Sequence, residues 1–231
     1  MKRYARTAVW TAVVSTLAIG VIGFAHTPMG RPLLRYVPLP GKGMCPVLGH
    51  EPDPQALEAQ RRATTAALKG AMRAGSLEAM GFALATSSRE QALQWAAAHQ
   101  VKCEHRLHDA ALDCSEVPEG ALSAFPSGLD SLFLRFDPGG KLVAIDAQAR
   151  RPVPQAAAVF GQYEHAVEGQ LGAPHRKLGD ASLLALASGP YQRGAVEYRF
   201  SDLAVDLSVT SLPSANGTDG LMRAQFRAIA E

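Results

Sequence analysis

The densest group of side chains that could do chemistry lies between residues 99 and 114. It consists of histidines, cysteines and aspartates: His99, Cys103, His105, His108, Asp109, Asp113 and Cys114. A tetrahedral zinc site needs four such ligands converging at about 2.0 to 2.3 Å. The spacing H-x3-C-x-H-x2-H-x5-C could supply them from His99, Cys103, His105 and Cys114. A metal-binding or thiol redox site at this cluster is therefore one hypothesis.

The same two sulfurs have a competing use in a disulfide. Residues 101–107 and 111–116 have the pattern of two strands, which predicts a hairpin around 108–110. In that hairpin Cys103 lies roughly opposite Cys114, whereas His108 lies in the turn as a solvated residue. The chain has three cysteines, which suits an oxidising compartment with one bridge and one thiol left over. We therefore predict a Cys103–Cys114 disulfide in preference to a metal site.

Sequence motifs of the common enzyme classes do not occur in the chain. It contains no G-x-S-x-G, no S-x-x-K, no H-E-x-x-H and no glycine-rich phosphate loop between a strand and a helix. Carboxylates such as Glu164, Glu168, Asp202 and Asp206 are spaced as expected of solvated faces, and no catalytic pair can be inferred from them. Nothing here gives a reason to propose an enzyme or a bound cofactor.

The amino-terminal segment 1–26 predicts a membrane anchor or an export signal. Residues 8–25 are uncharged, Lys2, Arg3 and Arg6 precede them, and no acidic residue occurs before Glu51. Eighteen residues are at the lower limit for a membrane-spanning helix and exceed the usual core of a cleavable signal. The anchor residues we expect in the lipid are Ala8, Trp10, Val14, Leu17, Ile19, Val21, Ile22 and Phe24. Cleavage before His26 is the alternative, and either outcome exports the rest of the chain.

Residues 27–53 predict an extended stalk between the membrane and a folded region. From Thr27 to Pro54 inclusive the chain has seven prolines, together with several glycines, and proline is incompatible with a helix interior or a central strand. Cys45 lies in this segment, twenty residues beyond Ala25 and directly after Met44. Because a lipid-modified cysteine would follow the apolar segment directly, we expect Cys45 to carry no lipid.

The charge balance argues against a nucleic-acid partner. The formal net charge is +2, but without Lys2, Arg3 and Arg6 the chain has 20 basic and 21 acidic residues. No basic stripe with interleaved aromatic residues is present.

The remaining sequence predicts an α+β fold in which helices pack on an antiparallel sheet. In a first module, 54–150, a helix follows Asp53-Pro54 and ends at Lys69-Gly70, and a capping box of Ser87 and Glu90 begins a second helix that ends near His99. The hairpin of residues 101–107 and 111–116, which contains Cys103 and Cys114, follows. A second hairpin joins residues 129–137 and 141–149 through the turn Pro138-Gly139-Gly140.

A second module is predicted over 151–231. A helix over 155–171 carries Phe160, Tyr163, Val167 and Leu171 on one face and ends at Gly172. Strands are expected over 195–200, 203–212 and 221–229. The order α-β-β-β therefore occurs twice, and an internal duplication is one explanation, supported only by the similar segments 134–137 and 198–201.

The second half, with a helix ending in Leu171-Gly172-Ala173-Pro174 before antiparallel strands, resembles the small modules of the SmpA/OmlA outer-membrane assembly lipoproteins. It also resembles the tandem halves of the beta-lactamase inhibitor proteins. Both groups act by binding other proteins, so the resemblance implies an envelope interaction protein. The chain lacks the lipoproteins' lipid-attachment cysteine, and no binding residue of either group matches a position here.

Together these features predict a single-pass inner-membrane protein whose carboxyl-terminal domain lies in the periplasm. We expect it to act as a binding or scaffolding component of an envelope assembly, with other envelope proteins as partners. A periplasmic metal or thiol redox protein using Cys103, His105 and Cys114 is the alternative.

Overall fold

The computed structural model describes residues 53–229 except Ala124 and Asn216. Within this part of the chain no helix is both long and apolar enough to cross a membrane. The predicted anchor over 8–25, Cys45 and the predicted stalk over 27–53, except its last residue Asp53, lie outside the described residues. Residues 52–231 form one compact unit.

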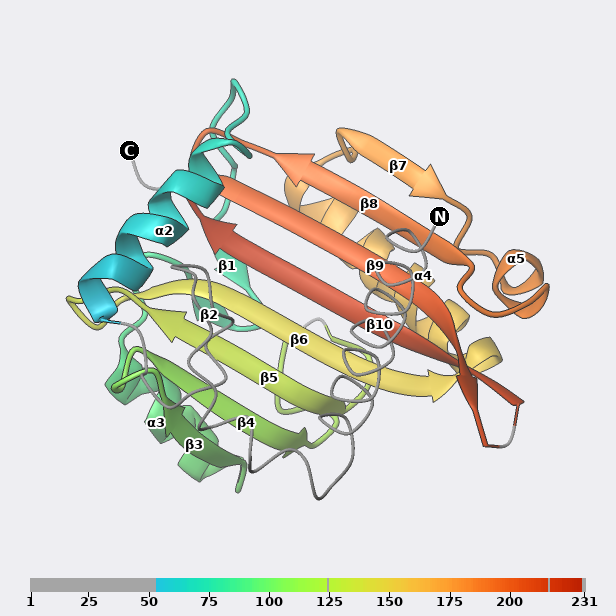
Figure 1. The fold of residues 1–231 in the computed structure, drawn as a ribbon, viewed down its shortest axis with the longest axis horizontal. Helices are drawn as coiled ribbons and strands as arrows, with labels where there is room; N and C mark the ends of the chain where they lie inside the picture. The colour runs from blue at the N-terminus through green and yellow to red at the C-terminus, as the bar shows by residue number, and fades with distance from the viewer. Residues whose placement is uncertain (1–52, 124, 216, 230–231) are drawn as a thin grey trace, which may run out of the picture. The chain divides into compact units, whose positions relative to one another are not determined.

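An eight-stranded antiparallel sheet organises this unit (Figure 1). Its strands, in spatial order, are β3 (Lys102–Arg106), β4 (Ala111–Val117), β5 (Leu129–Phe136), β6 (Leu142–Pro152), β10 (Gly217–Ala228), β9 (Leu203–Ser214), β8 (Arg193–Arg199) and β7 (Arg176–Gly179). The two hairpins and the three later strands predicted from the sequence are therefore confirmed. Apolar residues alternate along the central strands, which gives the sheet one buried face.

The helices α3 (Arg89–Ala98) and α4 (Val153–Leu171) cover the apolar face of the sheet, behind it in Figure 1. Along α4 the buried residues Phe160, Tyr163 and Val167 recur every three or four positions, as predicted for a helix with one apolar face. On the sheet, Leu203, Val205, Leu207 and Val209 of β9 are all buried. These side chains form the core.

A third helix, α2 (Pro54–Ala66), crosses the strand ends on the opposite face of the sheet (Figure 1). Its first turn forms as predicted, because the Asp53 side chain accepts a hydrogen bond from the Gln55 amide. The helix ends earlier than predicted, at Ala66. Residues 67–70 turn away, so that the Gly70 amide donates to the Phe200 carbonyl oxygen at 2.9 Å.

One smaller prediction is wrong, and four short elements were not predicted. The capping box of α3 uses Ser88 and Gln91, one residue later than the predicted Ser87 and Glu90. The Ser87 hydroxyl instead accepts a hydrogen bond from the Ala83 amide at 2.9 Å. The sequence also did not predict the short strands β1 (Glu78–Ala79), β2 (Phe82–Ala83) and β7, or the five-residue helix α5 (Leu183–Ala187).

The two predicted modules share one continuous sheet. In each, a helix is followed by four antiparallel strands of the sheet, α3 by β3–β6 and α4 by β7–β10, with α5 between β7 and β8. The predicted order α-β-β-β is therefore one strand short in both: the two predicted hairpins already supply β3–β6, and β7 was not predicted. The last strands of the two sets, β6 and β10, pair from Ala144 opposite Arg227 to Pro152 opposite Asp219. The similar segments 134–137 and 198–201 begin on the third strand of one set, β5, and on the second strand of the other, β8, so they do not occupy equivalent positions.

Candidate functional site

The polar face of the sheet carries a row of mostly acidic side chains that crosses all eight strands. Cross-strand pairing places its members in register: Glu104, Asp113, Phe133, Asp146, Gln225, Asp206, Glu197 and Arg176. Side chains directly opposite one another in an antiparallel pair lie about 4.5 to 5.5 Å apart at Cβ. Carboxylates this close repel one another unless cations lie between them.

The next row on the same face supplies those cations. It alternates arginine and alanine across seven strands: Arg106, Ala111, Arg135, Ala144, Arg227, Ala204 and Arg199. Each alanine leaves space beside a long arginine side chain, so the guanidinium groups can extend over the sheet. Neighbouring arginines in the row are two strands apart, about 9 to 10 Å between Cα atoms.

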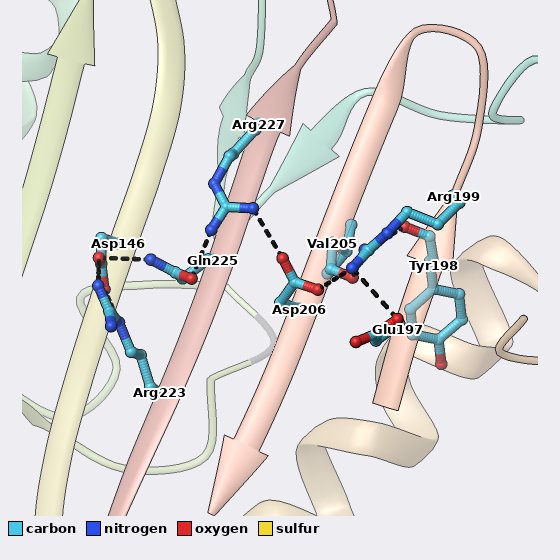
Figure 2. Close-up of polar contacts among 9 residues, drawn as sticks. All are labelled: Asp146, Glu197, Tyr198, Arg199, Val205, Asp206, Arg223, Gln225 and Arg227. Carbon is cyan, nitrogen blue, oxygen red and sulfur yellow. Dashed lines mark hydrogen bonds and ion pairs between the residues drawn. The ribbon is translucent and has the colours of Figure 1, made fainter. Parts of the chain in front are cut away.

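Figure 2 shows how these two rows connect over β8, β9, β10 and β6. The Asp206 carboxylate accepts from Arg199 on one side and from Arg227 on the other, at 2.7 Å for Arg227. Arg227 also donates to the Gln225 side-chain oxygen, and the Gln225 amide donates to Asp146 at 2.8 Å. The network links the consecutive strands β8, β9 and β10 to β6, which lies much earlier in the sequence.

The ends of this network bring in two more charged residues. The Arg199 guanidinium lies 3.3 Å from the Glu197 carboxylate. Asp146 is also paired with Arg223, whose Nε donates to it at 2.9 Å. These side chains are partly exposed, so each pair contributes little to stability by itself, and the network acts mainly to fix side-chain positions.

A buried ion pair attaches α2 to this face. The Arg61 guanidinium donates to both Glu58 carboxylate oxygens, at 2.7 and 2.8 Å, and to the Ala228 carbonyl oxygen at 2.8 Å. Arg62 donates to Glu58 as well. The hydrogen bonds from Arg61 are the largest cause of a lowered Glu58 pKa, and burial acts in the opposite direction. Glu58 is therefore held as a carboxylate.

Between α2 and the sheet lies a cavity of about 300 Å³. Its lining is rich in guanidinium groups and comprises Leu57, Gln60, Arg61, Thr64, Thr65, Arg135 and Arg227. Burial lowers the pKa of the partly buried Arg135, and the nearby positive charge of Arg61 lowers it further. A cavity with this lining can accept an anion.

A second, larger groove of about 590 Å³ lies on the other side of the sheet, between α4, β7 and α5. On the α4 side its wall is formed by small residues, among them Ala157, Ala158 and Gly161. The Lys177 ammonium group lies 2.8 Å from the Glu164 carboxylate, and both line the groove. Leu183 also lines it, and together with Leu184 and Tyr191 it belongs to the large apolar residues exposed on the described surface. This groove can accept apolar side chains.

The predicted disulfide is present. Cys103 and Cys114 are directly opposite one another on β3 and β4, and their sulfurs are 2.05 Å apart. The other residues of the cluster are used differently: the His99 ring lies against Trp95, and the His105 imidazole lies 2.8 Å from the Asp109 carboxylate. Among the described residues no group of three histidine, cysteine, aspartate or glutamate side chains is arranged to hold a metal ion.

The arginine cavity and the apolar groove were not predicted from the sequence. The cavity combines residues from three distant segments, and the groove depends on β7 and α5, which have no clear sequence pattern. One sequence signal could have indicated the arginine cavity: arginine occupies positions on the polar face of several strands, where threonine or serine would be usual.

Comparison of the chain with models of known families, with curated proteins and with solved structures finds no match.

Proposed function

We propose that the protein is a membrane-tethered periplasmic component of a cell-envelope assembly, and that it acts by binding another protein at the groove between α4, β7 and α5. The observation that carries the proposal is the exposed apolar surface at this groove. Leu183, which lines the groove, is 46% exposed, and the adjacent Leu184 of α5 is 85% exposed. Tyr191, in the segment between α5 and β8, is 69% exposed. Large side chains exposed together next to a groove typically mark an interaction site.

The edge of the sheet supports the same location. Among the described strands β7 pairs with β8 alone, so its outer backbone groups are available to an added strand. A partner in an extended conformation could hydrogen-bond to β7 and place apolar side chains in the groove, as in strand-addition complexes. Ala157 and Gly161 leave space for such side chains on the α4 wall.

Export is the second part of the proposal. The apolar segment 8–25 with its preceding positive charges supports it, and so does the Cys103–Cys114 disulfide, since disulfides persist mainly in oxidising compartments. The arrangement of a helix on antiparallel strands, repeated along the chain, agrees with the resemblance to envelope modules that bind proteins.

A crosslinking experiment in cells tests the binding surface. A photo-crosslinking amino acid at Leu184 of the full-length protein should give a specific adduct with one envelope protein. The same amino acid at Glu119, an exposed position in the turn after β4, should not. The substitution Leu183→Asp should abolish the adduct formed from position 184. Equal adducts from both positions, or no adduct from position 184, would contradict the proposed surface.

The metal or thiol redox function is the alternative, and the disulfide is the observation that bears on it. Cys103 is partly exposed, so a reductant could reach the bridge. Thiol counting and metal analysis of the full-length protein, purified without chelator, separate the two functions. One free thiol without metal supports a structural bridge, whereas three thiols with bound metal support the alternative.

A further inference from the structure

The cavity beneath α2 contains a guanidinium group whose charge is not neutralised by a direct partner. Arg135 makes no hydrogen bond or ion pair with any other described residue, although it lies partly buried between the sheet and α2. An arginine in this position normally forms a short contact to a carboxylate or a carbonyl oxygen, because an unpaired charge is costly to remove from water. Arg135 therefore has no carboxylate in direct contact among the described residues, although the charges of Glu58 and Asp146 act on it from a distance.

The carboxylates near Arg135 are already paired with other arginines. Glu58 accepts hydrogen bonds from Arg61 and Arg62. Asp146, on the neighbouring strand β6, accepts from Arg223 and Gln225, and Asp206, farther away on β9, accepts from Arg199 and Arg227. None of them can turn to Arg135 without leaving another guanidinium group unpaired.

The geometry brings further donors to the same cavity. Arg135 and Arg227 both lie opposite Ala144, one on each side of β6, and the small alanine leaves the space between them open. Arg61 enters from α2, and the Gln60 amide adds donors on the same wall. Guanidinium groups bind carboxylate and phosphate oxygens through paired hydrogen bonds.

We propose that this cavity is a binding site for the oxyanion group, phosphate or carboxylate, of a small ligand, and that Arg135 is its principal contact. Arg61 and Arg227 provide the secondary positive charge. The volume of about 300 Å³ accepts a group of this size and lies at the small end of ligand sites. The proposal is independent of the groove at α4, which lies on the other face of the sheet.

The proposed site couples anion binding to the attachment of α2. Both Arg61 and Thr65, which line the cavity, are buried residues of this helix. Without a bound anion, the positive charges of Arg61 and Arg135 repel each other across the cavity: burial is the main cause of the lowered pKa of Arg135, and the charge of Arg61 lowers it further while that of Glu58 opposes this. A bound anion would replace this repulsion by attraction and hold α2 against the sheet.

The test measures thermal unfolding of the full-length protein in a nonionic detergent. Sodium chloride is replaced stepwise by sodium phosphate or sodium succinate, up to 10 mM, at constant ionic strength and pH. Three proteins are compared: wild type, Arg135→Met and Arg106→Gln. The last is the matched control, because Arg106 lies in the same arginine–alanine row but pairs with Glu104 and Asp113 at the sheet edge.

We expect one or both anions to raise the unfolding temperature of wild type and of Arg106→Gln, since a ligand that binds only the folded state stabilises it. Half of the increase should be reached below about 1 mM anion. Arg135→Met should bind at least tenfold more weakly, as measured by calorimetry. In chloride alone the Arg135→Met protein should unfold at the same or a higher temperature than wild type, because the substitution removes the repulsion with Arg61.

A response to phosphate but not to succinate indicates a phosphoryl ligand, and a response to succinate but not to phosphate indicates a carboxylate. Equal responses of all three proteins, or no response of wild type, would overturn the proposal.

Discussion

Tyr198 is fully buried, yet its hydroxyl is the one buried side-chain polar atom in the described part of the chain without a hydrogen-bond partner. Burial is the main cause that raises the pKa of Tyr198 to about 12, with smaller contributions from Glu168 and Glu164. The residue therefore packs as a large apolar side chain and carries an uncompensated polar atom.

Replacing Tyr198 with phenylalanine should leave stability unchanged or raise the free energy of unfolding by about 1 kcal/mol, because the unpaired hydroxyl is removed. The variant should also lose less stability in alkali. Since the folded pKa exceeds the unfolded value of 10.0, wild type loses stability as the pH rises above 10. Chemical denaturation at pH 7 and pH 10.5 measures both effects. Tyr191→Phe, at an exposed site, should change neither, and a loss of more than 1 kcal/mol in Tyr198→Phe would contradict this account.

Gly70 is a second residue whose role follows from contacts. A Cβ atom at this position would lie 2.0 Å from the Arg199 carbonyl oxygen, a backbone atom that cannot move aside easily. The close approach is what allows the Gly70 amide to reach the Phe200 carbonyl oxygen.

Gly70→Ala should therefore lower the free energy of unfolding by about 2 kcal/mol, as for other overpacked sites. Gly75→Ala is the matched control, since a Cβ atom there meets nothing within 4 Å and the substitution should be neutral or slightly stabilising. Urea denaturation of the two variants and wild type gives the comparison. Similar stabilities for both variants would contradict this prediction and show that the backbone around Gly70 moves to accommodate the added Cβ atom.

At the scale of elements, α2 depends on one buried ion pair. Glu58 and Arg61 are each 8% exposed, and Arg61 links the helix to the end of β10 through the Ala228 carbonyl oxygen. Removing one member of such a pair costs more than the pair contributes, because it leaves the other charge buried and unpaired.

The substitution Glu58→Gln should lower the free energy of unfolding by about 2 kcal/mol at pH 7. Because the folded pKa of Glu58 lies below its usual value of 4.5, its contribution is present above pH 4.5 and is lost as the pH falls through the folded pKa. The difference between wild type and variant should therefore shrink on acidification below pH 4.5. Hydrogen exchange of the α2 amides distinguishes local release of the helix from global unfolding, and a difference independent of pH would contradict the ion-pair explanation.

The helices and strands that were predicted correctly are those whose sequence patterns lie within a short stretch of the chain. The start of α2, the apolar face of α4, the two hairpins and the disulfide all follow from patterns within about twenty residues. The capping box was misplaced because Ser87-Glu90 and Ser88-Gln91 both fit the pattern, and only the packing selects the second. The strand β7 has four residues and α5 five, too few for any periodicity.

The candidate sites could not be predicted because they depend on register between distant strands. Arg135, Arg227 and Arg61 are unremarkable within their own segments, and they meet only when β5, β6 and β10 pair and α2 crosses them. The same holds for the alternation of arginine and alanine across the sheet.

At the scale of the whole molecule, the boundary between the two predicted modules coincides with the middle of the sheet. The β6–β10 pairing joins the last strand of each half, and α4 packs against β6 as well as β9 and β10. Ala156 of α4, fully buried, lies so close to Gly220 of β10 that a Cβ atom there would approach it to 2.4 Å. Neither half therefore completes its own core.

This arrangement predicts that the two halves do not fold separately. Residues 53–152, which keep β6 whole, would alone expose the edge of β6, and residues 153–231 alone would expose β10 and the α4 side chains that contact β6; exposed apolar edges of this kind aggregate. Each fragment produced alone should lack a cooperative thermal transition and dispersed amide resonances. Produced together, the fragments should assemble into a complex with the circular dichroism of residues 53–231. A fragment that unfolds cooperatively as a monomer would show instead that the halves are independent domains and that the shared sheet is a late docking of two folded units.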